Sequence, residues 1–127
     1  MPLVRIDIPA GKPESYRKAV SEAVHAAMVE TINVPKDDRF QVITEHKVGD
    51  LVIDPAYLGI ARSADAILIQ ITLNEGRTVE MKQAFYKALA DGLHQRAGIR
   101  REDVVASLIE VKKENWSFGN GIAQYAK

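Results

Sequence analysis

The sequence matches itself when it is shifted by 65 residues, and this internal repeat limits the possible folds more than any other feature. The matches, which need no gap, include an apolar segment, a glycine and an acidic pair: Leu3–Ile8 on Leu68–Leu73, Gly11 on Gly76, and Asp37-Asp38 on Glu102-Asp103. The chain of 127 residues has the length of one domain. We therefore predict one domain built from two similar units, residues 2–46 and 67–111, joined by a hairpin region over 47–65.

Each unit shows the pattern of a strand, a helix and a second strand. The alternation of Val4, Ile6 and Ile8 with polar residues is typical of a half-buried strand. We predict strands at about 3–8, 40–45, 66–73 and 104–111. A strand–helix–strand unit gives two parallel strands with a right-handed crossover. Two units side by side predict an α/β (α+β) fold, with a four-stranded mixed sheet, both helices on one face and short hairpins.

The predicted helices have recognisable ends and inner faces. Pro13 is expected at the first helical position and the first helix should end near Asn33, while Thr78 should cap the second helix and Gly98 should end it. The residues expected to face the sheet have helical spacing: Tyr16, Ala19, Val20, Ala23, Val24, Ala27 and Met28, then Met81, Ala84, Phe85, Ala88, Leu89 and Leu93.

Two further segments and one sheet face have less regular patterns. Leu51–Ile53 lies between turn residues and is predicted to form a hairpin or edge strand, and Asn115–Gly121 a tight turn or short strand. The sheet face away from the helices would carry Leu3 and Leu68 among polar residues. Such a mixed face fits burial against another subunit, and a solvated face explains it nearly as well.

Composition excludes several classes of function. Lys plus Arg equals Asp plus Glu at 17 each, so nothing favours binding to nucleic acid or to a membrane surface. The absence of cysteine removes disulfides and thiolate chemistry. His25 and His94 lack the spacing of metal ligands, and no nucleotide-binding fingerprint is present. We predict a cytoplasmic protein without cofactor or metal.

Pro2 is the first candidate for chemistry. Removal of Met1 would leave the Pro2 nitrogen as a free secondary amine, held at the end of a strand. Such an amine can accept or donate a proton, or add to a carbonyl. Nearby cations or an apolar pocket would lower its pKa toward the working pH. Met-Pro openings without any chemical role are also common.

Several other side chains can assist such an amine. Arg77 follows the third strand and can hold a carboxylate, or it can be a solvated arginine at a helix start. Trp116 and Phe118 can form an apolar wall, or belong to the core. Asp38 can polarise a water or orient a substrate and Arg39 can reach a neighbouring site, unless both form a loop ion pair. His46 is a weaker candidate for acid–base work.

These features together resemble the tautomerase superfamily, and within it the malonate semialdehyde decarboxylase-like group. The resemblance covers nearly the whole chain and includes the Met-Pro opening, the duplicated unit and Arg77 after the third strand. Four segments carry it further: Val34–Gln41, Gly59–Ser63, Ala84–Lys87 and Trp116–Gly119.

The resemblance implies a homotrimer in which Pro2 acts as base or acid beside Asp38 and Arg77. It also implies a pocket lined by Trp116 and Phe118, with which we group Arg39 and Tyr125 as substrate-binding residues. One position departs from the decarboxylase pattern, which looks to have Arg-x-Arg where this chain has Glu75-Gly76-Arg77. A carboxylate there would weaken anion binding and raise the pKa of a nearby amine.

We therefore predict a tautomerase that moves a proton between keto and enol forms of a small 2-oxo acid. The first alternative is decarboxylation or hydration of a three-carbon oxo acid, with Asp38 activating water. The second is a non-catalytic trimeric protein of the same fold that binds a small molecule.

Overall fold

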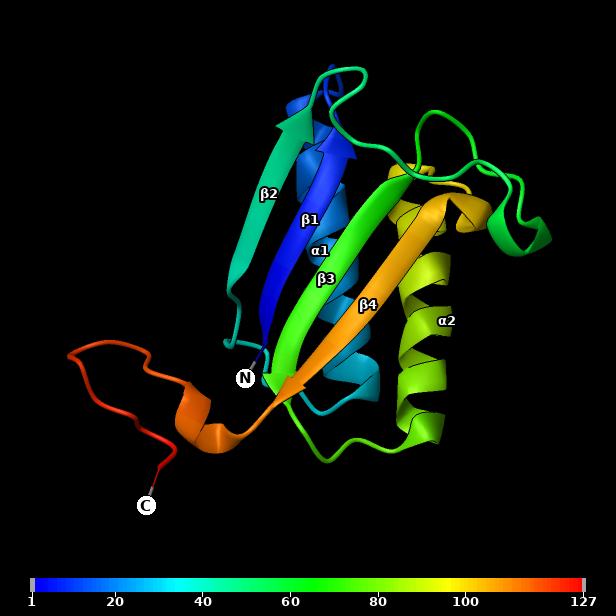
Figure 1. Ribbon diagram of the computed structural model, residues 1–127. Coiled ribbons are helices and arrows are strands. Elements are labelled where there is room, and N and C mark those ends of the chain that lie inside the picture. Colours follow the sequence, from blue (N-terminus) through cyan, green and yellow to red (C-terminus); the bar gives the residue numbers. More distant parts are fainter. Residues whose placement is uncertain (1, 127) are drawn as a thin grey trace.

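The computed structural model describes residues 2–126. Its elements follow the predicted order of two strand–helix–strand units (Figure 1). The strands and helices, in chain order, are β1 (Leu3–Pro9), α1 (Glu14–Thr31), β2 (Gln41–His46), β3 (Ile67–Asn74), α2 (Val79–Ala97) and β4 (Val104–Val111). Three single-turn 3₁₀ segments lie at Tyr57–Gly59, Arg101–Asp103 and Lys113–Asn115.

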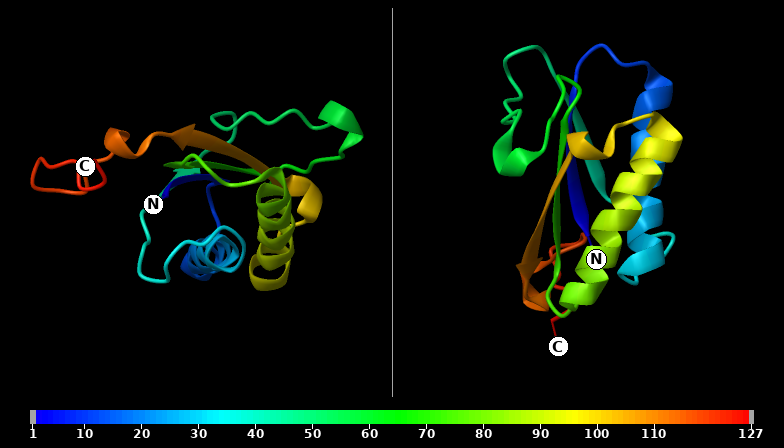
Figure 2. Two further views of the ribbon diagram at one scale, coloured as in Figure 1. Left: turned by 90° about the horizontal axis from the view of Figure 1, so that it is seen from below. Right: turned by 90° about the vertical axis from the view of Figure 1, so that its right-hand side faces the viewer.

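The four strands form one mixed sheet in the order β2-β1-β3-β4. Within each unit the strands are parallel, whereas the central pair β1 and β3 is antiparallel, with Arg5 opposite Gln70. Both helices cover the same face of the sheet, and the opposite face is left uncovered by helices (Figure 2). The predicted fold class is confirmed.

The core lies between the sheet and the two helices. Every second residue of β1 and β3 points toward the helices and is at most 1% exposed: Val4, Ile6, Ile8, Ile67, Ile69, Ile71 and Leu73. The helices contribute Val20, Val24 and Met28 from α1, and Phe85, Leu89 and Leu93 from α2. Side-chain alternation in a strand has a period of two, so this burial fixes which residues of β1 and β3 face away.

The helix ends agree with the sequence in most details. The Thr78 hydroxyl accepts a hydrogen bond from the Met81 N–H, and Gly98 ends α2 with a left-handed φ of 68°. Pro13 is the residue before α1 and not its first helical residue, because its ψ of 162° is extended. Ala84 was expected on the inner face of α2 but is exposed, because the buried stripe is narrower and centres on Phe85, Leu89 and Leu93.

The segment between the two units is irregular. Leu51–Ile53 forms no strand, which corrects the prediction: both sheet edges, β2 and β4, lack a further pairing partner in residues 2–126. The segment instead turns at Lys47–Asp50 and again at Tyr57–Gly59. Residues 115–121 form turns without a strand. Neither described helix is long and apolar enough to cross a membrane.

Candidate active site

The topology brings most of the predicted site residues to one end of the sheet. β1 and β2 begin at this end, and β3 and β4 finish there, because the central pair is antiparallel. The C-terminal end of α1 and the start of α2 lie at the same end, and the C-terminal segment leaves β4 there (Figure 1). We call this the Pro2 end of the molecule, and the other the Asp103 end.

Pro2 is buried and borders a hollow of about 250 Å³. The Val4 N–H donates to the Phe40 carbonyl at 2.9 Å, and the parallel register of β1 with β2 carries Pro2 alongside the segment before Gln41. The hollow is lined by Pro2, Leu3, Phe40, Trp116, Ser117 and Phe118. Met1, whose removal would free the Pro2 nitrogen, lies outside the described residues.

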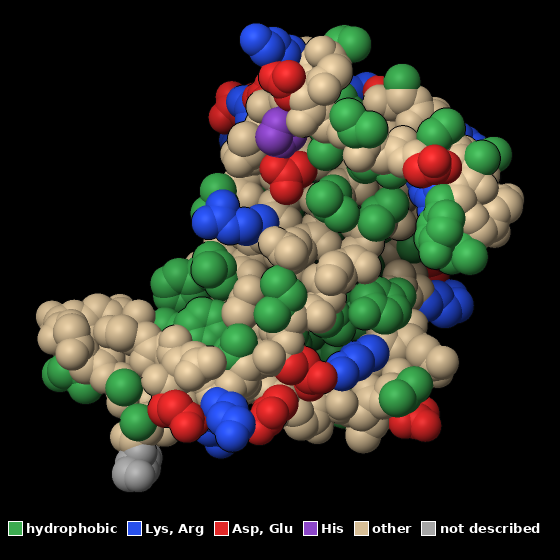
Figure 3. All heavy atoms as spheres, viewed as in Figure 1, with side chains coloured by type: hydrophobic (Ala, Val, Ile, Leu, Met, Phe, Trp, Pro, Cys, Tyr) green, Lys and Arg blue, Asp and Glu red, His purple; other side chains and the backbone are tan. Residues whose placement is uncertain are grey.

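The wall of the hollow is a row of aromatic rings. Trp116 and Phe118 stack with their centroids 5.4 Å apart, and Phe40 lies 6.1 Å from Phe118 on the other side. Tyr125 packs edge-on against Phe118 at 5.1 Å. Apolar side chains gather between this end of the sheet and the C-terminal segment (Figure 3). The rings keep one side of the hollow apolar, which favours the neutral form of an amine placed there.

Asn74 fixes Trp116, a contact that sequence reasoning missed. The Trp116 Nε1–H donates to the Asn74 Oδ1 at 2.8 Å. Asn74 is the last residue of β3, so the indole is attached to the rigid sheet although it belongs to an irregular segment. The sequence contained a signal for this contact, because Asn74 is a polar residue at the end of an apolar strand, three positions before Arg77.

Arg77 lies at the Pro2 end, where it caps the first helix. Its Nε–H and one Nη2–H donate to the Ile32 carbonyl at 3.2 and 3.0 Å, and an Nη1–H donates to the Asn74 carbonyl at 3.1 Å. Ile32 is the C-cap of α1, where carbonyls lack helical partners and a cation is favoured. A guanidinium has five N–H groups, so two remain for a carboxylate.

Asp38 is 9% exposed in the turn that leads into β2. Its N–H donates to the Pro35 carbonyl at 3.1 Å. Burial raises the pKa of its carboxyl group above the ordinary value, and the nearby His25 and Arg77 oppose this rise. A carboxyl group whose pKa is raised holds its proton more tightly than a solvated one, which suits it to exchange a proton with a substrate.

The remaining predicted residues do not join the hollow within this chain. Arg39 points to the surface of α1, where its Nη1 lies 2.9 Å from the Glu22 carboxylate. His46 lies at the far end of β2, with its Nε2 at 2.6 Å from Asp7 Oδ1. Glu75 is exposed at the Pro2 end, and its N–H donates to the Val111 carbonyl.

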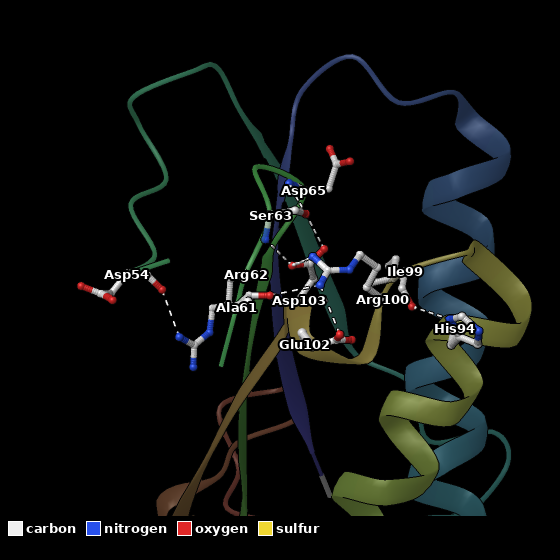
Figure 4. Close-up of polar contacts among 10 residues, drawn as sticks. All are labelled: Asp54, Ala61, Arg62, Ser63, Asp65, His94, Ile99, Arg100, Glu102 and Asp103. Carbon is white, nitrogen blue, oxygen red and sulfur yellow. Dashed lines mark hydrogen bonds and ion pairs between the residues drawn. The ribbon is translucent and has the colours of Figure 1, made fainter. Parts of the chain in front are cut away.

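The Asp103 end holds the residues that correspond at the offset of 65. Asp103 corresponds to Asp38, yet it accepts hydrogen bonds from Ser63 N–H at 2.7 Å and Ser63 Oγ–H at 2.5 Å, and it lies 3.6 Å from Arg100 Nη1 (Figure 4). This end has the larger hollow, about 470 Å³, near His46 and Lys47. It lacks a terminal amine, because Ile67 corresponds to Pro2.

The two joined β-α-β units form the fold that the resemblance implies, and a buried proline, an arginine, a carboxyl group and aromatic rings lie at one end of it. Comparison with known proteins identifies the family of the chain. Two family models, each described as a tautomerase enzyme, match residues 2–61 and 38–119. A probable tautomerase of Bacillus subtilis, YusQ, is 42% identical over 124 residues, which is 98% of each chain. The chain therefore belongs to the tautomerase superfamily.

Solved structures agree with this assignment. A malonate semialdehyde decarboxylase, described with decarboxylase and hydratase activities, is 34% identical with a TM-score of 0.90, over 97% of this chain and 95% of the other. A fused 4-OT that forms a symmetric trimer is 26% identical with a TM-score of 0.79, over 97% of both chains.

Proposed function

We propose that this protein is a tautomerase that transfers a proton between the enol and keto forms of a small 2-oxo acid. The observation that carries the proposal is that Pro2 borders an apolar hollow at the end of the sheet where Arg77 and Asp38 also lie, close enough for Arg77 to act on the Asp38 carboxyl group. Membership of the tautomerase superfamily supports the reaction class. The substrate class follows from the chemistry of the site, because it offers a cation, a base and an apolar wall.

The proposed mechanism needs Met1 to be removed. The Pro2 nitrogen then gives a proton to the carbon next to the carbonyl in ketonisation, or takes it from that carbon in enolisation, as a general acid or base. The two free N–H groups of Arg77 bind the substrate carboxylate as a fork. Asp38 exchanges a proton at the substrate oxygen, and Trp116 and Phe118 exclude water.

The proposal includes assembly as a homotrimer in the cytoplasm. The uncovered sheet face carries exposed apolar side chains, including Val42 and Ile109, beside the polar Arg5 and Gln70. The related fused 4-OT is a trimer. Sedimentation equilibrium should give three times the chain mass of 14.1 kDa. A monomer mass at micromolar concentration would refute this part alone.

The test follows the ultraviolet decay of phenylenolpyruvate or a 2-hydroxydienoate. Chain whose mass shows that Met1 is absent is compared with Pro2→Ala and with chain that keeps Met1. We expect fast ketonisation by the Met-free protein, a loss of about 10²-fold or more in Pro2→Ala, and none by the Met1 form, because an amide nitrogen has no basic lone pair. Wild-type decay no faster than buffer would refute the proposal.

Decarboxylation or hydration of a three-carbon oxo acid is the second candidate, supported by the similarity to malonate semialdehyde decarboxylase. Glu75 argues against it, because a carboxylate at the Pro2 end weakens anion binding. Turnover of malonate semialdehyde by the wild type, in the absence of enol ketonisation, would favour this candidate. If decarboxylation appears only in Glu75→Arg, the residue at this position decides between the two reactions.

A further inference from the structure

His25 is a buried side chain that the proposed mechanism does not use. It is 5% exposed in the middle of α1, beneath the turn that carries Asp38. Its Nε2 lies 2.7 Å from the Lys36 carbonyl oxygen. A carbonyl can only accept, so Nε2 carries the hydrogen in this contact. The ring is therefore attached to the backbone two residues before Asp38.

The same face of α1 holds the residues on both sides of Asp38. Glu22 pairs with Arg39, and Ser21 hydrogen-bonds to Gln41. The Glu22–Arg39 pair is exposed to solvent, where such a pair contributes little. Of these three α1 side chains only His25 is buried, and its contact reaches the turn two residues before Asp38.

We propose that His25 is a positioning residue for Asp38. Its bond to the Lys36 carbonyl fixes the turn Pro35–Asp38, so that the Asp38 carboxyl group stays buried at the Pro2 end, within electrostatic range of Arg77. The inference rests on the proposed function for its effect on catalysis. The placement of the carboxyl group is testable without turnover.

The second unit supports a specific role. At the offset of 65, Ala90 corresponds to His25 and Arg101 to Lys36. There the corresponding loop is held from α2 by Asp91, whose Oδ1 lies 2.9 Å from Arg101 Nε, and by the exposed His94, whose Nδ1 lies 3.1 Å from the Ile99 carbonyl oxygen. The unit that has no amine to assist thus also has no buried histidine beneath its aspartate.

Charged groups surround His25 and enter the design of the test. Glu22 and Lys36 flank it on the first unit, Asp38 and Arg39 lie in the turn, and Arg96 approaches from α2, together with Glu30 at the rim of the same depression. Loss of the electrostatic influence of His25 alone would raise the pKa of Asp38, since this ring opposes the rise. Loss of the turn would lower the pKa of Asp38, because the carboxyl group would regain water.

The experiment compares His25→Gln with His25→Leu. Glutamine can place an amide N–H where Nε2 lies, whereas leucine fills the space without a donor. Carbon-13 NMR of the side-chain carboxyl groups follows Asp38 against pH in each protein. The carboxyl resonance of Asp103 serves as an internal control at the other end of the molecule.

We expect the titration midpoint of the Asp38 carboxyl group in His25→Gln to stay as high as in the wild type or higher. In His25→Leu the same midpoint should fall toward the ordinary value for aspartate. In the enol assay, kcat should fall about 10- to 100-fold in His25→Leu, with KM changed less than about twofold and recovery in His25→Gln, because small misplacements are costly. The Asp103 resonance should be unchanged in both.

An Asp38 midpoint in His25→Leu that matches the wild type would overturn the inference, as would a fall in His25→Gln. If His25→Leu does not fold, His25→Asn replaces it, because its shorter amide does not reach Lys36, and the same fall is expected. A wild type without turnover whose Asp38 still responds as expected would refute the proposed function and leave this inference standing.

Discussion

Asp38 and Asp103 occupy corresponding positions in the two units but have different surroundings. Asp103 is 2% exposed and is held by two hydrogen bonds from Ser63 and by Arg100. Asp38 is 9% exposed in the turn that His25 contacts, and burial raises its pKa. We interpret one aspartate as structural and the other as chemical. The comparison teaches that an aspartate at the corresponding position of both units can have two different roles, because its neighbours determine the role.

The largest expected difference comes from changing each aspartate to asparagine. Asp38→Asn should reduce ketonisation about 10²-fold, because the proton-exchanging group is lost, and should leave the free energy of unfolding at pH 7 unchanged or higher. Asp103→Asn should keep the activity but lower that free energy by about 1–3 kcal/mol, since an amide cannot accept both hydrogen bonds. Urea unfolding and the enol assay measure the two effects. Equal losses of activity in both variants would refute the division of roles.

Arg77 and Lys12, which also correspond at the offset of 65, give the next contrast. Arg77→Ala should raise KM for the enol acid about 10-fold or more and lower the free energy of unfolding by about 1–3 kcal/mol, because Ile32 and Asn74 lose their charged donor. Lys12 forms an exposed pair with Asp65 at 2.9 Å. Lys12→Ala should change the free energy of unfolding by less than about 1 kcal/mol. A normal KM in Arg77→Ala would remove Arg77 from the site.

The pH dependence of stability should separate the two ends. The folded pKa of Asp38 is raised, so the folded state holds this proton more tightly than the unfolded chain. The free energy of unfolding therefore loses this contribution as the pH rises from the ordinary pKa of aspartate through the raised one. The free energy of unfolding of the wild type minus that of Asp38→Asn should fall across this pH window and then become constant. Urea unfolding between pH 3 and 7 measures this difference. A difference that rises with pH would contradict the raised pKa.

Tyr16 gives the alkaline counterpart near Asp103. Burial, with Asp65 and Asp103, raises the pKa of Tyr16 from 10.0 to about 12. The folded protein keeps the phenol proton while the unfolded chain loses it, so stability falls from pH 10 up to about 12. Tyr16→Phe should lack this part of the alkaline loss. Parallel thermal unfolding of both proteins tests this, and identical alkaline slopes would refute it.

The smallest effects are expected where the two units are most alike. Arg17 pairs with Glu45 at 2.6 Å, and the corresponding Lys82 pairs with Glu110 at 2.8 Å. Glu45→Gln and Glu110→Gln should each change the free energy of unfolding by less than about 1 kcal/mol, and by similar amounts, because partly exposed pairs contribute little. A large loss in the free energy of unfolding in only one of the two variants would show that the two ends differ in more than their aspartates.

The positions of strands and helices followed from the sequence because they depend on local patterns. Alternation in Val4–Ile8 and the cap at Thr78 act within a few residues, so they are visible without a fold. The hairpin or edge strand predicted at Leu51–Ile53 is wrong for the opposite reason. A strand needs a neighbouring strand, and none in the described chain lies beside it.

The sequence by itself determined the repeat, the four strands and two helices, the family resemblance and most candidate residues. The tertiary structure decided which of those residues meet. It joined Arg77 to the end of α1 and Trp116 to Asn74, moved Arg39 and His46 away from the hollow, and placed His25 beneath Asp38. These contacts join residues 11 to 45 positions apart. Such contacts depend on strand order and register, and no local pattern contains that information.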